Sequence, residues 1–313
     1  MFKPKVVLLF VWFIVLGQNS FCQENYVPYY DLINQAEASL SGKDWKKSID
    51  NYEKAFSLAP TAYVKDYVNA AIASHLLKND GLVEKYLAQA FIHGYSLDEY
   101  GKNFYLRKKI GLTVGQQVYE KCKSSVKVDK SLKNKIDGMF EIDQAVRNAR
   151  NKTYNGLTMN QVDDQNFADL DSIINKRGFP VESMIGHAES SYKLAVIMAH
   201  NCFVFDESAM DRLKKLVTEG KFLPRIYAWL VDRRISGKTK DRYYYTPYDY
   251  MPRTGKSFVS FQSVLAVDNT FDPAKVPIID GRRREIGLQT VENAQKFHRK
   301  EMIKYHFVTY VFP

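Results

Sequence analysis

A histidine at the end of an apolar stretch is the clearest candidate for chemistry in this chain. The stretch "LAVIMAH" ends at His200, and imidazole is the side chain that exchanges a proton most readily near neutral pH. As a general base, His200 would need a carboxylate to orient it, and Asp143 or Asp232 could take that role. Arg147 or Arg233 would then meet an anionic group of the substrate. These residues predict a small hydrolase-like enzyme as one candidate function.

The same charged residues also fit a structural role. In "EIDQAVR", Asp143 and Arg147 stand four positions apart on one helix face, with Gln144 beside them. An exposed pair of this kind contributes at most about 1 kcal/mol to stability. Arg233 follows Trp229 by four positions, so it shares the face of an aromatic residue that is expected to be buried. A network of these residues could equally hold helices in register.

The chain lacks the short motifs that mark common catalytic and ligand sites. There is no G-x-S-x-G, H-E-x-x-H, P-loop or paired C-x-x-C motif. None of the six histidines stands at metal-ligand spacing from another. We therefore expect neither a metal site nor a cofactor.

The first 22 residues are typical of a signal peptide. Lys3 and Lys5 precede an apolar run, and small residues, Ser20 and Cys22, stand where a peptidase would cut before Gln23. An uncleaved anchor is the alternative, but the run is shorter than the roughly 20 residues that a span needs. A lipoprotein site at Cys22 is a weaker alternative. We expect an exported protein, periplasmic or secreted in a Gram-negative bacterium, with no transmembrane anchor after cleavage.

The net charge and the cysteine content bear on two points, nucleic-acid binding and disulfide formation. The net charge is +10 over 313 residues, but the basic residues are scattered and no nucleic-acid-binding pattern accompanies them. We expect no specific nucleic-acid partner. After cleavage two cysteines remain, Cys122 and Cys202, which either form one disulfide or stay as buried thiols.

Residues 29–95 contain a repeat of about 35 residues. Its first unit places Ala36, Tyr52 and Ala55 at helix contacts, with "GKDW" as the turn, and the second unit places Ala71 and Ala90 in corresponding positions. This pattern resembles a tetratricopeptide repeat, which implies antiparallel helix pairs that bind a protein or peptide partner. We expect residues 26–122 to form such repeats with capping helices.

A lysine-rich stretch, residues 123–135, is predicted to be a linker. Residues 136–313 are expected to form a second, α-rich domain. Periodicity predicts helices from Ile136 and over 164–176, 185–200, 207–219, 223–235, 283–287 and 291–305. Between them, the aromatic stretch 241–263 is expected to form a short hairpin or a long loop. The fold class is therefore mostly α.

The second domain also resembles a bacterial domain family whose activity is not established, domain of unknown function 6624. The resemblance rests on "DQAVR" (143–147), "GFP" (178–180), "AHN" (199–201), "AWLVDR" (228–233) and "RRREIGL" (282–288). It implies that Gln144, Tyr244 and Arg283 join Arg147 and Arg233 as binding candidates. The chain departs from the family pattern at Asn201, where an acid is usual, and around Tyr244, where a glycine and two glutamines are missing.

Two functions follow from these patterns. The favoured one is an exported interaction or scaffold protein that uses its helical repeats. The alternative is the hydrolase-like enzyme with His200, Asp143 and Asp232 as catalytic candidates.

Overall fold

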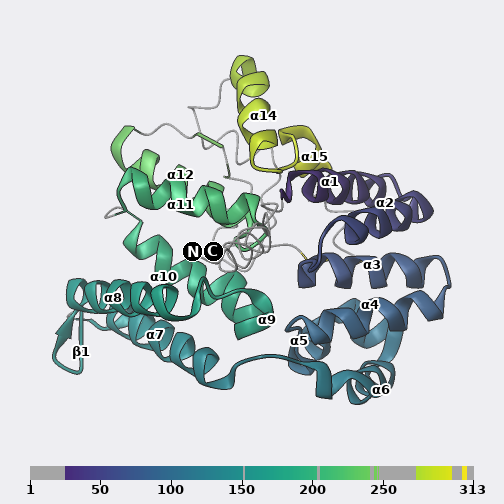
Figure 1. The fold of residues 1–313 in the computed structure, drawn as a ribbon, viewed down its shortest axis with the longest axis horizontal. Helices are drawn as coiled ribbons and strands as arrows, with labels where there is room; N and C mark the ends of the chain where they lie inside the picture. Colours follow the sequence, from purple (N-terminus) through teal and green to yellow (C-terminus); the bar gives the residue numbers. More distant parts are fainter. Residues whose placement is uncertain are drawn as a thin grey trace, which may run out of the picture.

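The computed structural model describes residues 25–150, 152–202, 205–239, 243–244, 246, 273–297 and 305–308. These parts are almost entirely helical (Figure 1), which confirms the predicted mostly α fold. The predicted signal peptide, 1–22, lies outside the described residues, and so does most of the aromatic stretch 241–263. In the described part, no helix is both long enough and apolar enough to cross a membrane.

The N-terminal part is a stack of helices. α1 (Val27–Ser41), α2 (Trp45–Leu58), α3 (Val64–Leu76) and α4 (Asp80–Ile92) each pack on the next, and they occupy the right side of Figure 1. Alanines allow the close approach of these helices. The residues Ala36, Ala55, Ala71 and Ala90 are fully buried.

The stack is closed by shorter elements. α5 (Leu97–Lys102), a π-helical turn (Leu106–Gly111) and α6 (Leu112–Cys122) follow α4, and α6 packs on α4. Gly115 of α6 lies against the ring of Tyr100, where a Cβ atom would come within 2.4 Å of a ring carbon. A 3-10 turn (Lys123–Ser125) then leads away from the stack.

The predicted linker, 123–135, overlaps a long helix. α7 (Lys130–Asn148) begins inside it, because the Asp129 side chain accepts a hydrogen bond from the main-chain N of Leu132, 3.0 Å away, and caps the first turn. Leu132 is buried. The lysines of this stretch therefore belong to the outer face of an amphipathic helix from Lys130 onwards.

A short hairpin between α7 and α8 was not predicted. β1 (Thr153–Tyr154) pairs antiparallel with β2 (Leu157–Thr158). Its turn is Asn155–Gly156, with φ angles of 49° and 78°, and this dipeptide is a strong hairpin signal. Thr158 then caps α8 (Met159–Arg177), which begins earlier than predicted because Thr158 and Gln161 form a capping box.

The helix predicted over 185–200 is divided. α9 (Glu182–Ile185) ends at Gly186, whose φ of 92° does not continue a helix, and a π-helical turn (Glu189–Lys193) leads into α10 (Leu194–Asn201). α10 is almost completely buried and packs against α7, α8 and α12 (Pro224–Thr239).

The remaining described elements lead from α10 back to the stack. They are α11 (Glu207–Thr218), α12 (Pro224–Thr239), a 3-10 turn (Pro273–Lys275), α14 (Val276–Glu285) and α15 (Val291–Phe297). The last helix was predicted over 291–305, but its described part ends at Phe297, and Tyr305 lies in a turn.

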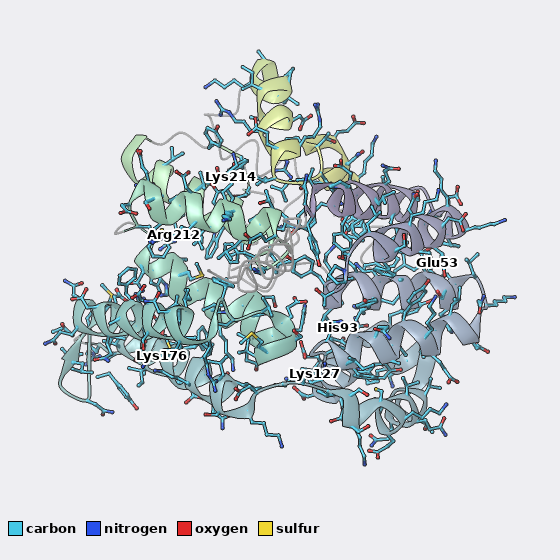
Figure 2. The ribbon with its side chains drawn as sticks, in the orientation of Figure 1. Glu53, His93, Lys127, Lys176, Arg212 and Lys214 are labelled. Carbon is cyan, nitrogen blue, oxygen red and sulfur yellow. The ribbon has the colours of Figure 1, made fainter. Side chains whose placement is uncertain are left out.

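The two parts of the chain share one hydrophobic core. α15 packs on α1, and the main-chain N of Tyr26 donates to the carbonyl of Thr218, 2.8 Å away. The Tyr30 hydroxyl donates to the carbonyl of Val217, also at 2.8 Å. In Figure 2, nitrogen-tipped and oxygen-tipped side chains project from the outer edges of both parts.

Candidate functional site

The first candidate site is built around Asp143 of α7. Its carboxylate is fully buried and accepts hydrogen bonds from Nη1 of Arg147 at 2.8 Å, Nδ1 of His200 at 3.0 Å and Nε2 of Gln144 at 2.7 Å. Nη2 of the same arginine contacts Asp163 of α8 at 2.6 Å. The site therefore joins α7, α8 and α10 through one buried carboxylate.

This geometry suits a histidine that moves a proton. The side chain of His200 is 19% exposed, whereas that of Asp143 is sealed. When Asp143 is ionised, Nδ1 donates to it, and Nε2 keeps the lone pair that a general base uses. Arg147 contacts two carboxylates, so both of its terminal nitrogens already serve the protein itself.

Asp232 belongs to a different cluster. Its carboxylate accepts from the main-chain N atoms of Tyr243, Tyr244 and Thr246, at 2.8, 2.7 and 2.6 Å, and from the Thr246 hydroxyl at 2.8 Å. Nη1 of Arg283 donates to the Tyr244 carbonyl at 3.0 Å. Burial raises the pKa of Asp232, and these hydrogen bonds oppose that rise. Asp232 therefore anchors a loop, and within the described structure it makes no hydrogen bond with His200.

Arg233 lies beside the end of α10. Its Nε donates to the carbonyl of Ala199 at 3.0 Å, which satisfies one of the free carbonyls at a helix C-terminus. Cys202 is close by, and burial raises its pKa while Arg233 lowers it. Cys122 and Cys202 are both free and buried, so these two described cysteines are thiols and no disulfide joins them.

The predicted site residues thus fall into separate sets. Asp143, Gln144, Arg147 and His200 meet, whereas Asp232, Tyr244 and Arg283 form the second cluster. Asp232 and Arg233 contact different groups, because consecutive residues of a helix point in different directions.

A second histidine–carboxylate pair, not predicted, joins the two parts of the chain. Nδ1 of His187 lies 2.7 Å from Oε1 of Glu99, and the main-chain N of His187 donates to the carbonyl of Gly94 at 3.0 Å. Burial acts to lower the pKa of His187, but Glu99, Glu182 and Glu189 raise it above its ordinary value. Burial acts to raise the pKa of Glu99, and its contact with His187 brings it below the ordinary value.

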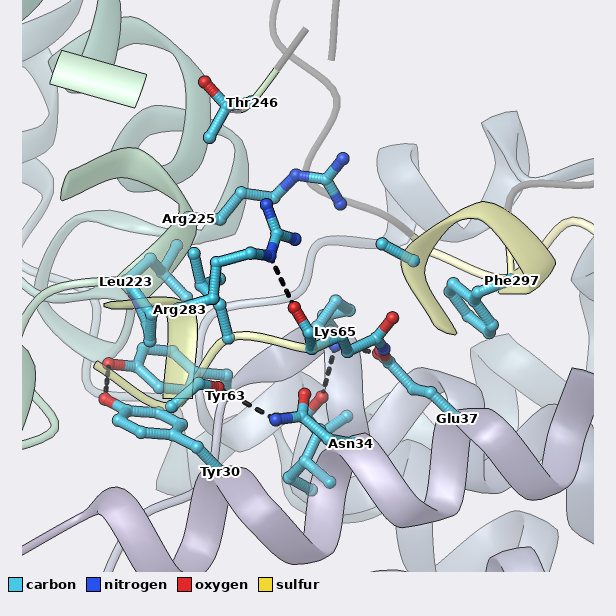
Figure 3. Close-up of a pocket in the computed structure, with 17 residues that line it drawn as sticks. Tyr30, Asn34, Glu37, Tyr63, Lys65, Leu223, Arg225, Thr246, Arg283 and Phe297 are labelled. Carbon is cyan, nitrogen blue, oxygen red and sulfur yellow. Dashed lines mark hydrogen bonds and ion pairs between the residues drawn. The ribbon is translucent and has the colours of Figure 1, made fainter. Parts of the chain in front are cut away.

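A cavity of about 90 Å³ lies where α1 and α3 face α12, α14 and α15 (Figure 3). Arg283 is one of the predicted site residues and lines this cavity, whereas His200 does not line it. The charged residues that line it are Glu37, Lys65, Asp66, Arg225 and Arg283. Four of these were not singled out in the sequence, because the elements that carry them are distant along the chain and no local motif marks them.

The charges of this cavity are arranged in two groups. Nζ of Lys65 lies 2.8 Å from Oδ1 of Asp66 and also contacts Glu37, which in turn accepts from Gln289. Burial acts to lower the pKa of Lys65, but the two carboxylates raise it above its ordinary value. Burial and the nearby Arg283 lower the pKa of Arg225 to about 10, and Glu37 opposes this change.

The chain's own C-terminal segment, residues 305–308, lies on the helix stack. The Asn69 side chain of α3 contacts both main-chain groups of Val308: Nδ2 donates to its carbonyl at 3.0 Å, and Oδ1 accepts from its N–H at 2.7 Å. Nδ2 of Asn103 donates to the carbonyl of His306 at 2.9 Å. We name Trp45, Asn69, Asn103 and Phe104 the segment-binding surface; its aromatic rings lie 5.3 Å from Tyr305 and 5.0 Å from His306, centre to centre.

No cluster of three or more histidine, cysteine or acidic side chains suited to a metal ion occurs in the described part of the chain. Comparison with models of known families, with curated proteins and with solved structures finds no match to this chain. The tetratricopeptide-like repeat and the resemblance to domain of unknown function 6624 therefore stay predictions.

Proposed function

We propose that this protein is an exported interaction protein that binds a polypeptide segment on its N-terminal helix stack. The observation that carries this proposal is the double hydrogen bond between Asn69 and the main chain of Val308. An asparagine that contacts both the N–H and the carbonyl of one residue recognises backbone, whatever side chain that residue carries. The segment then serves as an internal example of the ligand.

The neighbouring side chains support the same function. The rings of Trp45 and Phe104 contact two consecutive residues of the segment, Tyr305 and His306, which adds a preference for aromatic side chains to the recognition of the backbone.

A peptide of residues 301–313 (EMIKYHFVTYVFP) is the probe for this function. In the full chain, Val308→Pro removes the N–H that donates to Asn69 and should release the internal segment. The labelled peptide should then bind at least about tenfold more tightly than to the parent protein, because the competing segment is gone. Fluorescence anisotropy measures this difference.

Two further variants make the test specific. Adding Asn69→Ala to Val308→Pro should abolish peptide binding, whereas adding Asn175→Ala, an exposed asparagine on α8, should leave it unchanged. Equal binding to the parent and to Val308→Pro would contradict the proposal, as would binding that survives the loss of Asn69.

One observation favours a second candidate function, hydrolysis. It is the hydrogen bond between His200 and the buried Asp143, with the histidine side chain partly open to solvent. In this reading His200 is the general base and Asp143 orients it. The peptide-binding function is preferred because Arg147, the expected contact for an anionic substrate group, already holds Asp143 and Asp163.

A further inference from the structure

The segment that lies on the helix stack contains one residue with an unusual backbone conformation. His306 has a φ angle of 48°, in the left-handed region, and among the described residues 305–308 it is the only one with a positive φ. A Cβ atom makes this region unfavourable, so glycine enters it most freely, and asparagine, aspartate and histidine occupy it more often than other residues. Tyr305 and His306 lie in a turn. The stack therefore contacts a turned backbone, and not a fully extended one.

Two asparagines of the stack hold the main chain on either side of Phe307. Nδ2 of Asn103 donates to the carbonyl of His306 at 2.9 Å. The side chain of Asn69 contacts the N–H and the carbonyl of Val308, at 2.7 and 3.0 Å. The carbonyl of His306 is thus fixed relative to the next residue but one, which holds the backbone in the turned form. All three hydrogen bonds go to main-chain atoms, so they place no demand on the side chain at position 306.

The stack itself orients the amide of Asn103. Its Oδ1 accepts from the main-chain N of Leu106 at 3.1 Å, where the π-helical turn begins. Nδ2 is the end of the amide that meets the segment. A donor in a fixed position requires a carbonyl at one place in the ligand, and a surface that is already in its binding geometry loses little entropy when the ligand arrives.

The side chain of His306 makes a contact of its own. Its ring centre lies 5.0 Å from that of Phe104, which is 46% exposed. Two preferences therefore act at one position: the ring of Phe104 favours an aromatic side chain, and the left-handed backbone favours glycine. Histidine meets part of each requirement, because it carries a ring and enters the left-handed region more readily than most residues.

We propose that the segment-binding surface selects peptides that form a turn. The ligand carries a residue that tolerates the left-handed conformation two positions before the residue held by Asn69, and an aromatic residue directly before that, as Tyr305 does against Trp45. Glycine, asparagine and histidine are the residues that suit the turn position. This selectivity rests on the proposed function, peptide binding to the stack, and narrows the class of ligand that the stack takes.

Four labelled peptides of residues 301–313 test the selectivity on the full chain with Val308→Pro. The first two carry His306→Gly or His306→Ala, which both lack the ring and differ only in their tolerance of a positive φ. The glycine peptide should bind at least about fivefold more tightly, the equivalent of about 1 kcal/mol. The controls carry Phe307→Gly or Phe307→Ala. Position 307 has no positive φ, so glycine there should bind no more tightly than alanine.

A second measurement uses the chain's own segment and needs neither a peptide nor Val308→Pro. In the full chain, His306→Gly and His306→Ala are compared by hydrogen exchange at the amide of Val308, which donates to Asn69. This amide has the same neighbours in both variants, so the difference in rate reports how often the segment leaves the stack. Exchange should be at least about fivefold slower with glycine.

The possible results separate this selectivity from the function on which it rests. Failure of all four peptides to bind would contradict the proposed function, and the ligand preference with it. Equal affinity of the two position-306 peptides, or equal exchange at Val308 in the two full-chain variants, would overturn the selectivity and leave peptide binding in place. A similar gain from glycine at position 307 would also overturn it, because flexibility alone would then explain the tighter binding.

Discussion

Two histidine–carboxylate pairs lie in different regions of the described structure. In one pair the histidine is the less exposed partner, and in the other pair it is the more exposed partner. His187 and Glu99 connect the C-terminal helices to the stack, and both side chains are largely covered, at 11% and 17% exposure. His200 and Asp143 lie within the C-terminal part, where the carboxylate is fully buried and the histidine is 19% exposed.

The charged and polar groups that surround the two pairs also differ. Asp143 is also held by Arg147 and Gln144, so its charge is compensated whether or not His200 carries a proton. His187 instead faces the carboxylates of Glu99, Glu182 and Glu189, which favour its protonated form. A histidine next to a carboxylate thus forms an ion pair that joins two parts of the chain in one case, whereas in the other case the histidine keeps a side that is partly open to solvent.

The largest effect should come from removing the buried carboxylate. Asp143→Ala leaves the Arg147 guanidinium without the partner it has inside the protein, and we expect a loss of about 3–5 kcal/mol in the free energy of unfolding. Urea denaturation measures it. Asp163→Ala, which removes the more exposed partner of the same arginine, should cost clearly less. A loss below about 1 kcal/mol for Asp143→Ala would show that the cluster is in effect solvated.

The pair between the two parts should give an intermediate effect that depends on pH. The pKa of His187 is raised above 6.5, so its contribution is complete below pH 6.5 and is lost as the pH rises through the folded-state value. The pKa of Glu99 is lowered below 4.5, so its contribution is complete above pH 4.5 and is lost as the pH falls. Between these values, Glu99→Gln should cost about 1.5–3 kcal/mol.

The control for this pair is Ser96→Ala, because Glu99 also forms a capping box with Ser96 at the start of α5. Loss of the cap alone should cost about 1 kcal/mol and leave the pH dependence of the parent above pH 6.5 unchanged, because the contact between His187 and Glu99 remains. Denaturation curves measured from pH 4 to pH 8 should therefore be flatter above pH 6.5 for Glu99→Gln only. Identical pH profiles for Glu99→Gln and the parent would exclude the pair as the cause.

The smallest effect on stability should come from His200→Gln. Asp143 keeps Arg147 and Gln144 as donors, and the replaced ring is partly exposed, so we expect a loss of about 1 kcal/mol or less. If the second candidate function holds, hydrolysis of a chromogenic ester should fall about 10²–10⁴-fold in the same variant. His93→Gln on the helix stack is the matched control, and equal hydrolysis by both variants would remove His200 from the chemistry.

The sequence was most informative where the determining contacts are local. The mostly α fold follows from periodicity and caps, and the contact between Asp143 and Arg147 needs only the four-residue spacing of a helix. The turn at Asn155–Gly156 is also a local signal, because this dipeptide favours the positive φ angles of a tight hairpin. The burial of α10 agrees with its apolar composition.

Contacts between distant parts of the chain could not be predicted in the same way. His187 and Glu99 are 88 positions apart, and Glu37 and Gln289 are 252 apart. In the sequence, each of these residues is typical of a polar residue in a helix or turn, because the neighbouring residues do not indicate which distant residue it contacts. The cavity with Arg225 and Arg283 depends on the same kind of long-range packing. The sequence therefore indicates only Arg283 as a binding candidate, through the family resemblance.

The contact between Asn69 and Val308 has a consequence for how the protein is made. The two residues are 239 positions apart, and the ribosome synthesises the chain from its N-terminus. The helices that carry Trp45 and Asn69 can therefore form while the residues that will cover them are still untranslated. Asn69 receives this internal partner only after residue 308 has been synthesised, so until then the main-chain contacts of the segment are absent and the surface around Trp45 and Asn69 is not covered by it.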